Sequence, residues 1–227
     1  MRVVRARGGI SGSPTKSSGA PSARVGRPDP ADAGSMRRRI LDSASRLLVD
    51  VGYADLSMRK LASVIGYSAT TIYLHFDSKD ALFHALVEEG MERLRDYLRD
   101  ALDPEAEPFE QLEALCEAYI RFGLENSEYY EIMFVVHPAS VNRFPADKYR
   151  RARTNLDLFA SALASLDGKG SAVTDEARVE ATAVWATLHG TVSLLNADRV
   201  DLAVDRRKLV DATVRRAIDA TRFQSVA

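Results

Sequence analysis

The sequence has few of the residues that disulfide frameworks, metal sites and membrane spans require. One cysteine, Cys116, occurs among 227 residues, so no internal disulfide can form. The four histidines lie on separate segments, without the short pair spacing of metal ligands. No run of eighteen apolar residues is present, so no transmembrane helix is expected. We therefore expect no metal, no cofactor, no membrane partner and a cytoplasmic protein, with Cys116 buried as a small apolar residue.

Catalytic and nucleotide-binding motifs are also missing. The tetrapeptide GKGS at residues 168–171 resembles part of a phosphate loop, but Leu163 stands where the Walker pattern requires glycine. The dinucleotide fingerprint G-x-G-x-x-G does not occur. Nothing in the sequence places Cys116 beside a histidine as a nucleophilic pair. The sequence therefore does not predict an enzyme.

Residues 1–35 contain no aromatic residue and instead hold six glycines, four prolines and six serines. Such a segment cannot bury enough apolar surface to offset its ordering entropy, so we expect it to be a disordered basic tail. The apolar run of a secretory signal and the amphipathic period of a transit peptide are both missing. The tail is either a basic arm that touches DNA phosphates or a solvated extension, and Met36 is an alternative start of translation.

Charge is distributed unevenly, although the formal net charge of the chain is only −1. Lys and Arg exceed Asp and Glu by four in residues 1–35 and by two in residues 36–83, whereas residues 84–227 carry a net charge of −7. The apolar fraction of 46% is enough for a large core. A basic front half and an acidic rear half indicate a polyanionic partner at the N-terminal end.

From Arg37 onward the sequence carries apolar residues at helical spacing. Gly52 is expected to end the first helix, and Ser57, Ser68 and Ser78 have the character of helix N-caps. No strand-like alternation with turn residues appears, so we predict an all-α fold. The expected helices cover about 37–51, 57–66, 68–76, 78–102, 109–125, 127–136, 145–166, 174–196 and 205–222.

Two short helices joined at Gly66 fit a helix-turn-helix. Ile72 and Phe76 lie four residues apart and are expected to anchor the second of these helices in the core. We predict a helix-turn-helix DNA-binding domain over residues 36–83 and a larger helical body over residues 84–227. Small side chains at the start of a recognition helix allow it to enter a major groove. The side chains expected to face outward are Ala69, Thr70, Thr71, Tyr73 and Leu74.

Residues 37–89 resemble the N-terminal domain of TetR-type transcriptional regulators, most closely in LLVDVGYADLSMRKLASVIG and TIYLHFDSKDALF. The resemblance implies phosphate contacts from Tyr73, His75 and Lys79, phosphate or groove-edge contacts at the start of the second helix, and base contacts along the recognition helix. Ala69 and Thr70 depart from the longer polar residue or glycine of many relatives, which leaves the base preference open. Each polar position is alternatively an ordinary solvated side chain. The DNA-binding positions implied are Ser57, Arg59, Ser68, Ala69, Thr70, Thr71, Tyr73, Leu74, His75 and Lys79.

The rear body also resembles one subgroup of these regulators. VWATLHGTVSLL at 184–195 is similar to a Trp-His-Gly signature, and NSEYYEIMFV at 126–135 fits the same subgroup. The resemblance implies that residues 84–227 bind a small effector, which the large apolar side chains predict to be mostly apolar or aromatic. These side chains are alternatively packed core, with His189 hydrogen-bonded to a neighbour. The candidate effector-binding residues are Leu115, Tyr119, Phe122, Met133, Phe134, Phe159, Trp185 and His189.

The last two helices, about 174–196 and 205–222, carry broad apolar stripes that are expected to pair two subunits in a four-helix interface. Packing within one subunit is the alternative. By family resemblance the protein is a ligand-responsive transcriptional regulator, most simply a repressor that binds a palindromic operator as a homodimer, although activation stays open. The competing hypothesis is a helical protein-interaction module without specific DNA binding. The stripe residues are Ala181, Val184, Leu188, Val192 and Leu195, followed by Leu209, Val210, Thr213, Val214, Ala217, Ile218 and Thr221.

Overall fold

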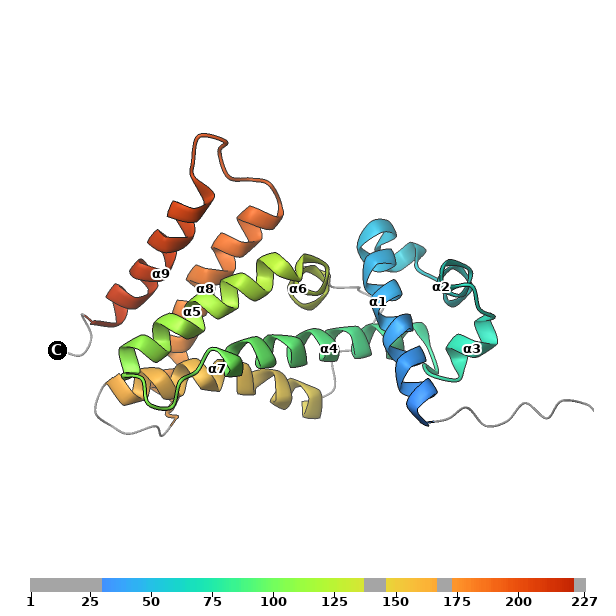
Figure 1. Cartoon of the computed structure of the whole chain (residues 1–227), viewed down its shortest axis with the longest axis horizontal. Helices are drawn as coiled ribbons and strands as arrows, with labels where there is room; N and C mark the ends of the chain where they lie inside the picture. The colour runs from blue at the N-terminus through green and yellow to red at the C-terminus, as the bar shows by residue number, and fades with distance from the viewer. Residues whose placement is uncertain (1–29, 137–145, 167–172, 223–227) are drawn as a thin grey trace, which may run out of the picture.

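The computed structural model of the chain describes residues 30–136, 146–166 and 173–222, and every regular element in these ranges is an α-helix (Figure 1). The predicted all-α fold is therefore confirmed. The helices are α1 (Pro30–Asp55), α2 (Met58–Ile65), α3 (Ala69–Tyr73), α4 (Lys79–Asp100), α5 (Pro108–Glu125), α6 (Ser127–Phe134), α7 (Ala146–Leu166), α8 (Asp175–Asn196) and α9 (Arg206–Arg222).

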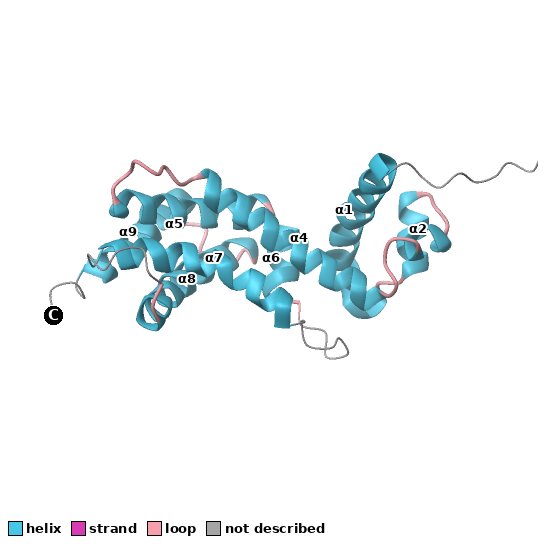
Figure 2. Ribbon diagram, turned by 90° about the horizontal axis from the view of Figure 1, so that it is seen from below, coloured by secondary structure: helices cyan, strands magenta, loops and turns pink. Residues whose placement is uncertain are grey.

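The helices form two groups that α4 connects. Helices α1, α2 and α3 gather at one end of the molecule, and α5 to α9 form a bundle at the other (Figure 1). Helix α4 runs from the first group along the bundle, which Figure 2 shows from a second direction. Helix α1 packs on α2, α4 and α6, so the small group meets the bundle through α4 and α6. No helix in the described ranges is both long enough and apolar enough to cross a bilayer.

Three serine N-caps predicted from the sequence are present. The Oγ atoms of Ser57, Ser68 and Ser78 accept hydrogen bonds from the backbone N–H three residues later, at 3.1, 3.2 and 3.0 Å respectively. Each serine has an extended backbone, which is the conformation of an N-cap. These caps fix where α2, α3 and α4 begin, and so fix the orientation of the short α3.

Helix α1 begins earlier than the sequence predicted. It starts at Pro30, so residues 30–35 of the predicted disordered tail are helical, while residues 1–29 lie outside the described residues. Proline suits the first position of a helix because its missing N–H has no helical partner there. Gly52 interrupts the helical backbone with φ 75° and ψ 165°, near the predicted end of the helix. Helix α1 therefore begins six residues before Met36.

Two glycines allow close packing in the bundle. A Cβ atom on Gly90 of α4 would lie 2.4 Å from Sδ of Met133, so α6 rests directly on the α4 backbone. A Cβ atom on Gly123 of α5 would lie 2.5 Å from Cγ1 of Val192 and 3.0 Å from the Tyr130 ring. Distances below 3.0 Å leave no room for any larger residue without displacement. Helix α6 is consequently held tightly between α4 and α5.

Candidate nucleic-acid interface and effector site

The turn between α2 and α3 is built as the sequence predicted. Gly66 adopts the left-handed conformation, with φ 76° and ψ 30°, and the N–H of Tyr67 donates to the carbonyl of Ala62 at 2.9 Å. Helix α3 then folds back onto α2. Ile72 is fully buried and Phe76 is 4% exposed, which confirms their role as the two core anchors of this segment.

The anchored α3 turns a mixed polar and apolar face to solvent. Thr70 is exposed, Tyr73 is 51% exposed and Leu74 is 76% exposed. Helix α3 ends at Tyr73, earlier than predicted, but the N–H of Leu74 still donates to the carbonyl of Thr70 at 3.1 Å. Leu74 therefore continues the same face. The exposed leucine and tyrosine thus lie side by side on a firmly anchored helix.

The remaining predicted positions in this region differ in how exposed they are. Thr71 is half-buried, and its Oγ1 lies 3.0 Å from Oγ of Ser68, so the two hydroxyls bond each other. Ala69 and His75 are half-buried as well. Ser57, Arg59 and Ser68 are exposed, the first two at the start of α2.

Lys79 has a structural role that the sequence did not reveal. Its Nζ donates to three backbone carbonyls at the end of α1, those of Tyr53 (2.6 Å), Ala54 (3.3 Å) and Leu56 (2.9 Å). It also lies 4.2 Å from the centroid of the Tyr53 ring. An ammonium has three hydrogens to donate, and all three have carbonyl partners here. The predicted phosphate contact of Lys79 would require these bonds to break, so its side chain is an anchor that joins α4 to the end of α1.

Two arginines of α1 and Tyr67 lie beside α3, and the sequence prediction missed all three. The Arg37 guanidinium lies 5.2 Å from the Phe76 ring centroid, and Nη1 of Arg39 donates to Oη of Tyr67 at 3.2 Å. Arg37 and Arg39 are exposed, and Tyr67 is 40% exposed. The signal was available in the run of three arginines directly before Ile40.

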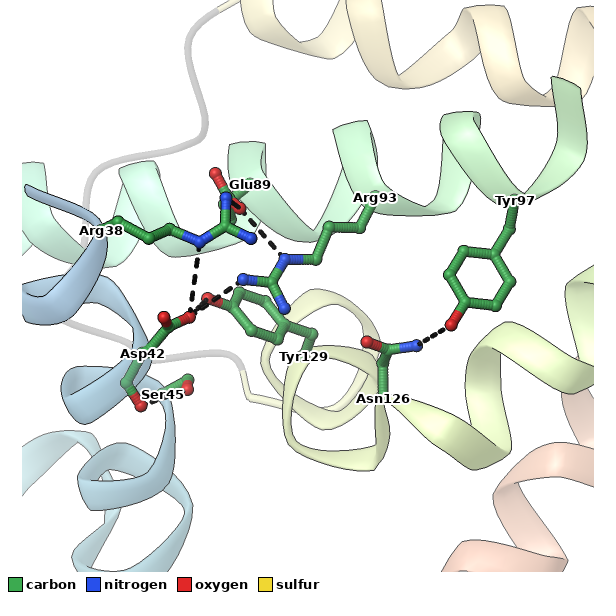
Figure 3. A network of polar contacts seen from close by, with 8 residues as sticks. All are labelled: Arg38, Asp42, Ser45, Glu89, Arg93, Tyr97, Asn126 and Tyr129. Atoms are coloured by element: carbon green, nitrogen blue, oxygen red, sulfur yellow. Dashed lines mark hydrogen bonds and ion pairs between the residues drawn. The ribbon is translucent and has the colours of Figure 1, made fainter. Parts of the chain in front are cut away.

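A set of four alternating charges joins α1 to α4 (Figure 3). Nη1 of Arg38 lies 2.7 Å from Oε1 of Glu89, whose other partner is Nε of Arg93 at 3.0 Å. Nη2 of Arg93 lies 2.9 Å from Oδ1 of Asp42, which also faces Nε of Arg38 at 3.7 Å. We call Arg38, Asp42, Glu89 and Arg93 the charge bridge. Its two members on α4 are mostly buried, with side chains 13% exposed for Glu89 and 22% for Arg93.

Helix α6 takes part in the charge bridge through Tyr129. The Arg93 guanidinium lies 4.2 Å from the Tyr129 ring centroid, and Oη of Tyr129 is 3.5 Å from Oδ1 of Asp42. Burial raises the pKa of Tyr129 to about 12, so it stays a neutral hydroxyl. Helices α1, α4 and α6 therefore meet at one polar contact (Figure 3).

The neighbouring residue of α6, Tyr130, belongs to a group of aromatic side chains in the bundle. Nε1 of Trp185 donates to Oη of Tyr119 at 2.8 Å, and Oη of Tyr119 lies 3.2 Å from Oη of Tyr130. Oη of Tyr130 is 2.5 Å from Nδ1 of His189, and their rings stack at 5.4 Å. Phe134 closes the group, 5.8 Å from Trp185 and 5.3 Å from His189 between ring centroids. We call these five residues the aromatic cluster.

Burial in the aromatic cluster favours neutral side chains. It lowers the pKa of His189 below 6.5, and it raises the pKa of both Tyr119 and Tyr130. Tyr119 and Tyr130 are buried, whereas Phe134, Trp185 and His189 are half-buried. The cluster is thus a neutral hydrogen-bonded group with one partly open edge.

The predicted effector-binding residues fall into two sets. Tyr119, Phe134, Trp185 and His189 come together in the aromatic cluster. The sequence prediction missed Tyr130, although it lies within residues 126–135, which resemble the subgroup, and four residues before Phe134. The other four predicted residues are core side chains that the cluster does not include, namely Leu115, Phe122, Met133 and Phe159.

The apolar stripes predicted to pair two subunits are covered within one chain. On α8, Ala181, Leu188 and Val192 are fully buried, and on α9 Val214 and Ala217 are 3% exposed. Helices α8 and α9 pack on each other and on α5, so the alternative of packing within one subunit holds for these stripes. The buried members of the stripes cannot also face a second subunit, whereas Leu209, Val210 and Thr221 are half-buried. The members buried in this way are Ala181, Val184, Leu188, Val192, Leu195, Thr213, Val214, Ala217 and Ile218.

A different face of α8 is open. Val179 is 66% exposed and Leu194 is 49% exposed, and Ala183, Ala186 and Gly190 lie between them at spacings of three and four residues. Nothing lies within 4 Å of the position a Cβ atom on Gly190 would take. We call these five residues the open α8 face. It is apolar, and its middle consists of small residues, which allow two helices to approach closely.

Two family models match the chain. Residues 40–86 match the model described as bacterial regulatory proteins of the tetR family, and residues 112–217 match the tetracyclin repressor-like C-terminal domain. The two matched regions together make up more than half of the chain. The chain belongs to the TetR family.

Curated TetR-type relatives match parts of the chain. The HTH-type transcriptional repressor Rv1474c of Mycobacterium tuberculosis is 47% identical over 58 residues, which are 26% of this chain and 31% of that protein. The HTH-type transcriptional activator FasR of Mycolicibacterium smegmatis is 32% identical over 98 residues, 43% of this chain and 45% of that protein. The chain thus spans less than half the length of these relatives.

Solved structures share the TetR-type fold over most of the chain. A Rhodococcus sp. RHA1 protein of unknown function has a TM-score of 0.67 and 28% identity, covering 86% of this chain and 97% of that one. The putative regulatory protein SCO4313 has a TM-score of 0.70 at 23% identity, covering 84% and 98%. AibR, solved with isovaleryl coenzyme A and operator DNA, has a TM-score of 0.62 at 22% identity, covering 78% and 95%.

Membership of the TetR family confirms the prediction that the chain is not an enzyme, because the family and the matched relatives are transcriptional regulators. The assignment to the Trp-His-Gly subgroup stays a prediction, since the matched C-terminal model does not name it.

Proposed function

We propose that this TetR-family protein is a ligand-responsive transcriptional regulator, most simply a repressor, that binds a palindromic operator as a homodimer. The observation that carries the proposal is the exposed face of α3, which presents Tyr73 and Leu74 on a helix anchored by Ile72 and Phe76. A short helix offered in this way fits a major groove. The repressor Rv1474c and the activator FasR are both relatives, and the higher identity of the former supports repression.

Residues 36–83 are our candidate for the DNA-binding domain, with α1 extending it from Pro30. Thr70, Tyr73 and Leu74 form the part of the surface that enters the groove. Arg37 and Arg39 add positive charge beside α3, where phosphate contacts would position the helix without reading sequence. The full set of candidate DNA contacts comprises Ser57, Arg59, Ser68, Ala69, Thr70, Thr71, Tyr73, Leu74 and His75, together with Arg37, Arg39 and Tyr67.

The open α8 face is our candidate for the homodimer interface. Two copies of α8 that cross at Gly190 would bury the exposed Val179 and Leu194 of each subunit. Small residues at a crossing let two helix backbones approach closely. A two-fold axis here would also give the DNA-binding domains the symmetry of a palindromic operator.

The aromatic cluster is our candidate for the effector site. It lies in the body over residues 84–227, and its open edge offers the faces of Phe134 and Trp185. The structure of AibR with isovaleryl coenzyme A and operator DNA supports the view that this fold can hold both kinds of ligand. A mostly apolar effector suits a cluster without charged members.

The charge bridge gives this proposal a mechanism. Tyr129 touches the bridge and Tyr130 belongs to the aromatic cluster, so a shift of α6 acts on both. An effector that binds one arrangement of α6 better than another would change how α1 is held against α4, and with it the spacing of the two recognition helices.

Selection of bound fragments from the host genome tests the proposed function. A regulator retains a small set of fragments that share a palindromic sequence, and the retention weakens steeply as salt rises. The competing interaction module would retain no fragment, or would retain all fragments alike. Retention without a shared sequence would therefore overturn specific regulation.

A further inference from the structure

The hydrogen bonds of the aromatic cluster run in one direction. The indole N–H of Trp185 can only donate, so Oη of Tyr119 accepts, and Tyr119 then donates to Tyr130. Oη of Tyr130 lies 2.5 Å from Nδ1 of His189 but 3.4 Å from the His189 carbonyl, so its hydrogen goes to Nδ1. We assign Nδ1 as an acceptor on this geometry, which places the hydrogen of the neutral imidazole on Nε2.

This Nε2–H donor is only weakly used inside the protein. Its described partner is Oγ of Ser193 at 3.5 Å, longer than an effective hydrogen bond. His189 and Ser193 are both half-buried, so part of each side chain's surroundings is open to solvent. The open edge of the cluster therefore offers a hydrogen-bond donor in need of an acceptor.

Flat apolar surfaces flank the donor. The Trp185 and His189 rings lie 5.2 Å apart, and Phe134 meets His189 at 5.3 Å. Stacking on such faces favours a planar conjugated molecule over a flexible chain. The hydrogen bonds described within the cluster link neutral side chains only. A charged ligand would therefore lose its hydration without meeting a side chain of opposite charge among them.

We propose that the aromatic cluster recognises an uncharged planar aromatic molecule through a carbonyl oxygen that accepts from Nε2 of His189. The proposal rests on the effector site proposed above and adds the chemical class of its ligand. The ring of the ligand lies against Phe134 and Trp185. The carbonyl oxygen of the ligand replaces Oγ of Ser193 as the acceptor for Nε2–H of His189.

Trp185 makes the test direct, because it is the only tryptophan of the chain. Its fluorescence is titrated with benzamide, benzoate and benzylamine at neutral pH, with no DNA present. We expect benzamide to give a saturable change and the two charged probes to bind about tenfold more weakly. Benzylamine offers no acceptor to Nε2–H, and the charge of benzoate loses hydration without meeting an opposite charge in the cluster. Benzylamine that binds as tightly as benzamide would overturn the proposal, because aromatic faces alone attract cations. So would the absence of binding up to the solubility limit of benzamide.

Two substitutions of His189 distinguish the contribution of its Nε2–H donor from the contribution of its ring. The amide nitrogen of His189→Gln reaches about as far as Nε2, whereas the shorter His189→Asn reaches only as far as Nδ1. We expect the Gln variant to keep the preference for benzamide and the Asn variant to lose it, with thermal melts to show that both fold. Equal loss in the two variants would contradict the proposal. If a variant fails to fold, the order of the three probes on the natural chain still decides it.

The outcome is independent of DNA binding. Benzamide binding by a protein that retains no genomic fragment would refute the regulator and leave the ligand class intact. Selective retention of DNA without benzamide binding would support the regulator and refute the ligand class.

Discussion

At the scale of single residues, the anchoring of α3 rests on two side chains and one glycine. Ile72 and Phe76 bury the inner face of the segment, and Gly66 supplies the left-handed turn that directs it. Their burial leaves Tyr73 and Leu74 no route into the same core, so these side chains are presented to solvent. The exposed face is thus a consequence of how the inner face packs.

Lys79 provides a stability prediction at this scale. Lys79→Ala removes three hydrogen bonds to carbonyls of the α1 end, and we expect it to lower the free energy of unfolding by about 1–3 kcal/mol in urea denaturation. The exposed Lys60→Ala is the matched control, with an expected change within about 0.5 kcal/mol. Equal effects of the two substitutions would show that the anchor contributes nothing.

His189 provides a prediction on pH. Burial lowers its pKa in the folded state below the 6.5 of an exposed histidine, so the unfolded chain binds more protons below that pH. The stability linked to His189 is therefore complete above pH 6.5 and is lost as the pH falls through 6.5 toward the lower folded pKa. Melting temperatures between about pH 8 and pH 5 should fall less steeply for His189→Gln than for the natural chain. Identical slopes would show that burial of His189 does not weaken the fold in acid.

At the scale of helices, α8 has one face for its own subunit and one that is open. Leu194→Glu places a charge on the open α8 face, and we expect it to convert a dimer into a monomer in sedimentation or light-scattering measurements. The control is Leu202→Glu, because Leu202 is completely exposed in the loop after α8 and lies outside that face. A Leu194→Glu variant that stays dimeric would place the interface elsewhere.

Local signals predicted the helices well. Ser57, Ser68 and Ser78 act on a backbone N–H three residues away, so their effect is visible in a short stretch of sequence. The structural role of Lys79 was not visible in the sequence because its carbonyl partners lie 23–26 residues earlier, beyond any periodic pattern.

The apolar stripes of α8 and α9 show a second limit. The helical periodicity predicts that residues such as Leu188 and Val214 are buried, and the structure confirms their burial. It cannot say whether the covering surface belongs to the same subunit or to another, because both give the same pattern. The candidate effector residues fell into two sets for a similar reason. Core side chains such as Phe122 and cluster members such as Trp185 are both large and apolar, so the sequence alone does not distinguish them.

At the scale of the whole molecule, the charge bridge sets how the DNA-binding end is held against the bundle. Arg93→Met removes the α4 arginine of the charge bridge, which contacts Asp42, Glu89 and the Tyr129 ring. We expect it to lower affinity for a selected operator roughly fivefold to tenfold with every DNA-facing residue intact. The loss arises because α1 is then less well positioned.

Arg95→Met is the control for this prediction. Arg95 also lies on α4, but its described contacts go to Thr154 and Asn155 of α7, within the bundle. It should affect stability while leaving operator affinity nearly unchanged. Equal losses of affinity in the two variants would show that the charge bridge has no special part in orientation.

The central claim is that the exposed face of α3 lies against duplex DNA. The most direct measurement is a fluorescence-anisotropy titration of a selected genomic fragment at several salt concentrations, with the natural chain and with Tyr73→Ala. We expect the logarithm of the binding constant to fall linearly with the logarithm of salt, by about 0.9 per phosphate neutralised, and Tyr73→Ala to bind more weakly at every salt concentration. Binding that is insensitive to salt, or unchanged in the Tyr73→Ala variant, would contradict the claim.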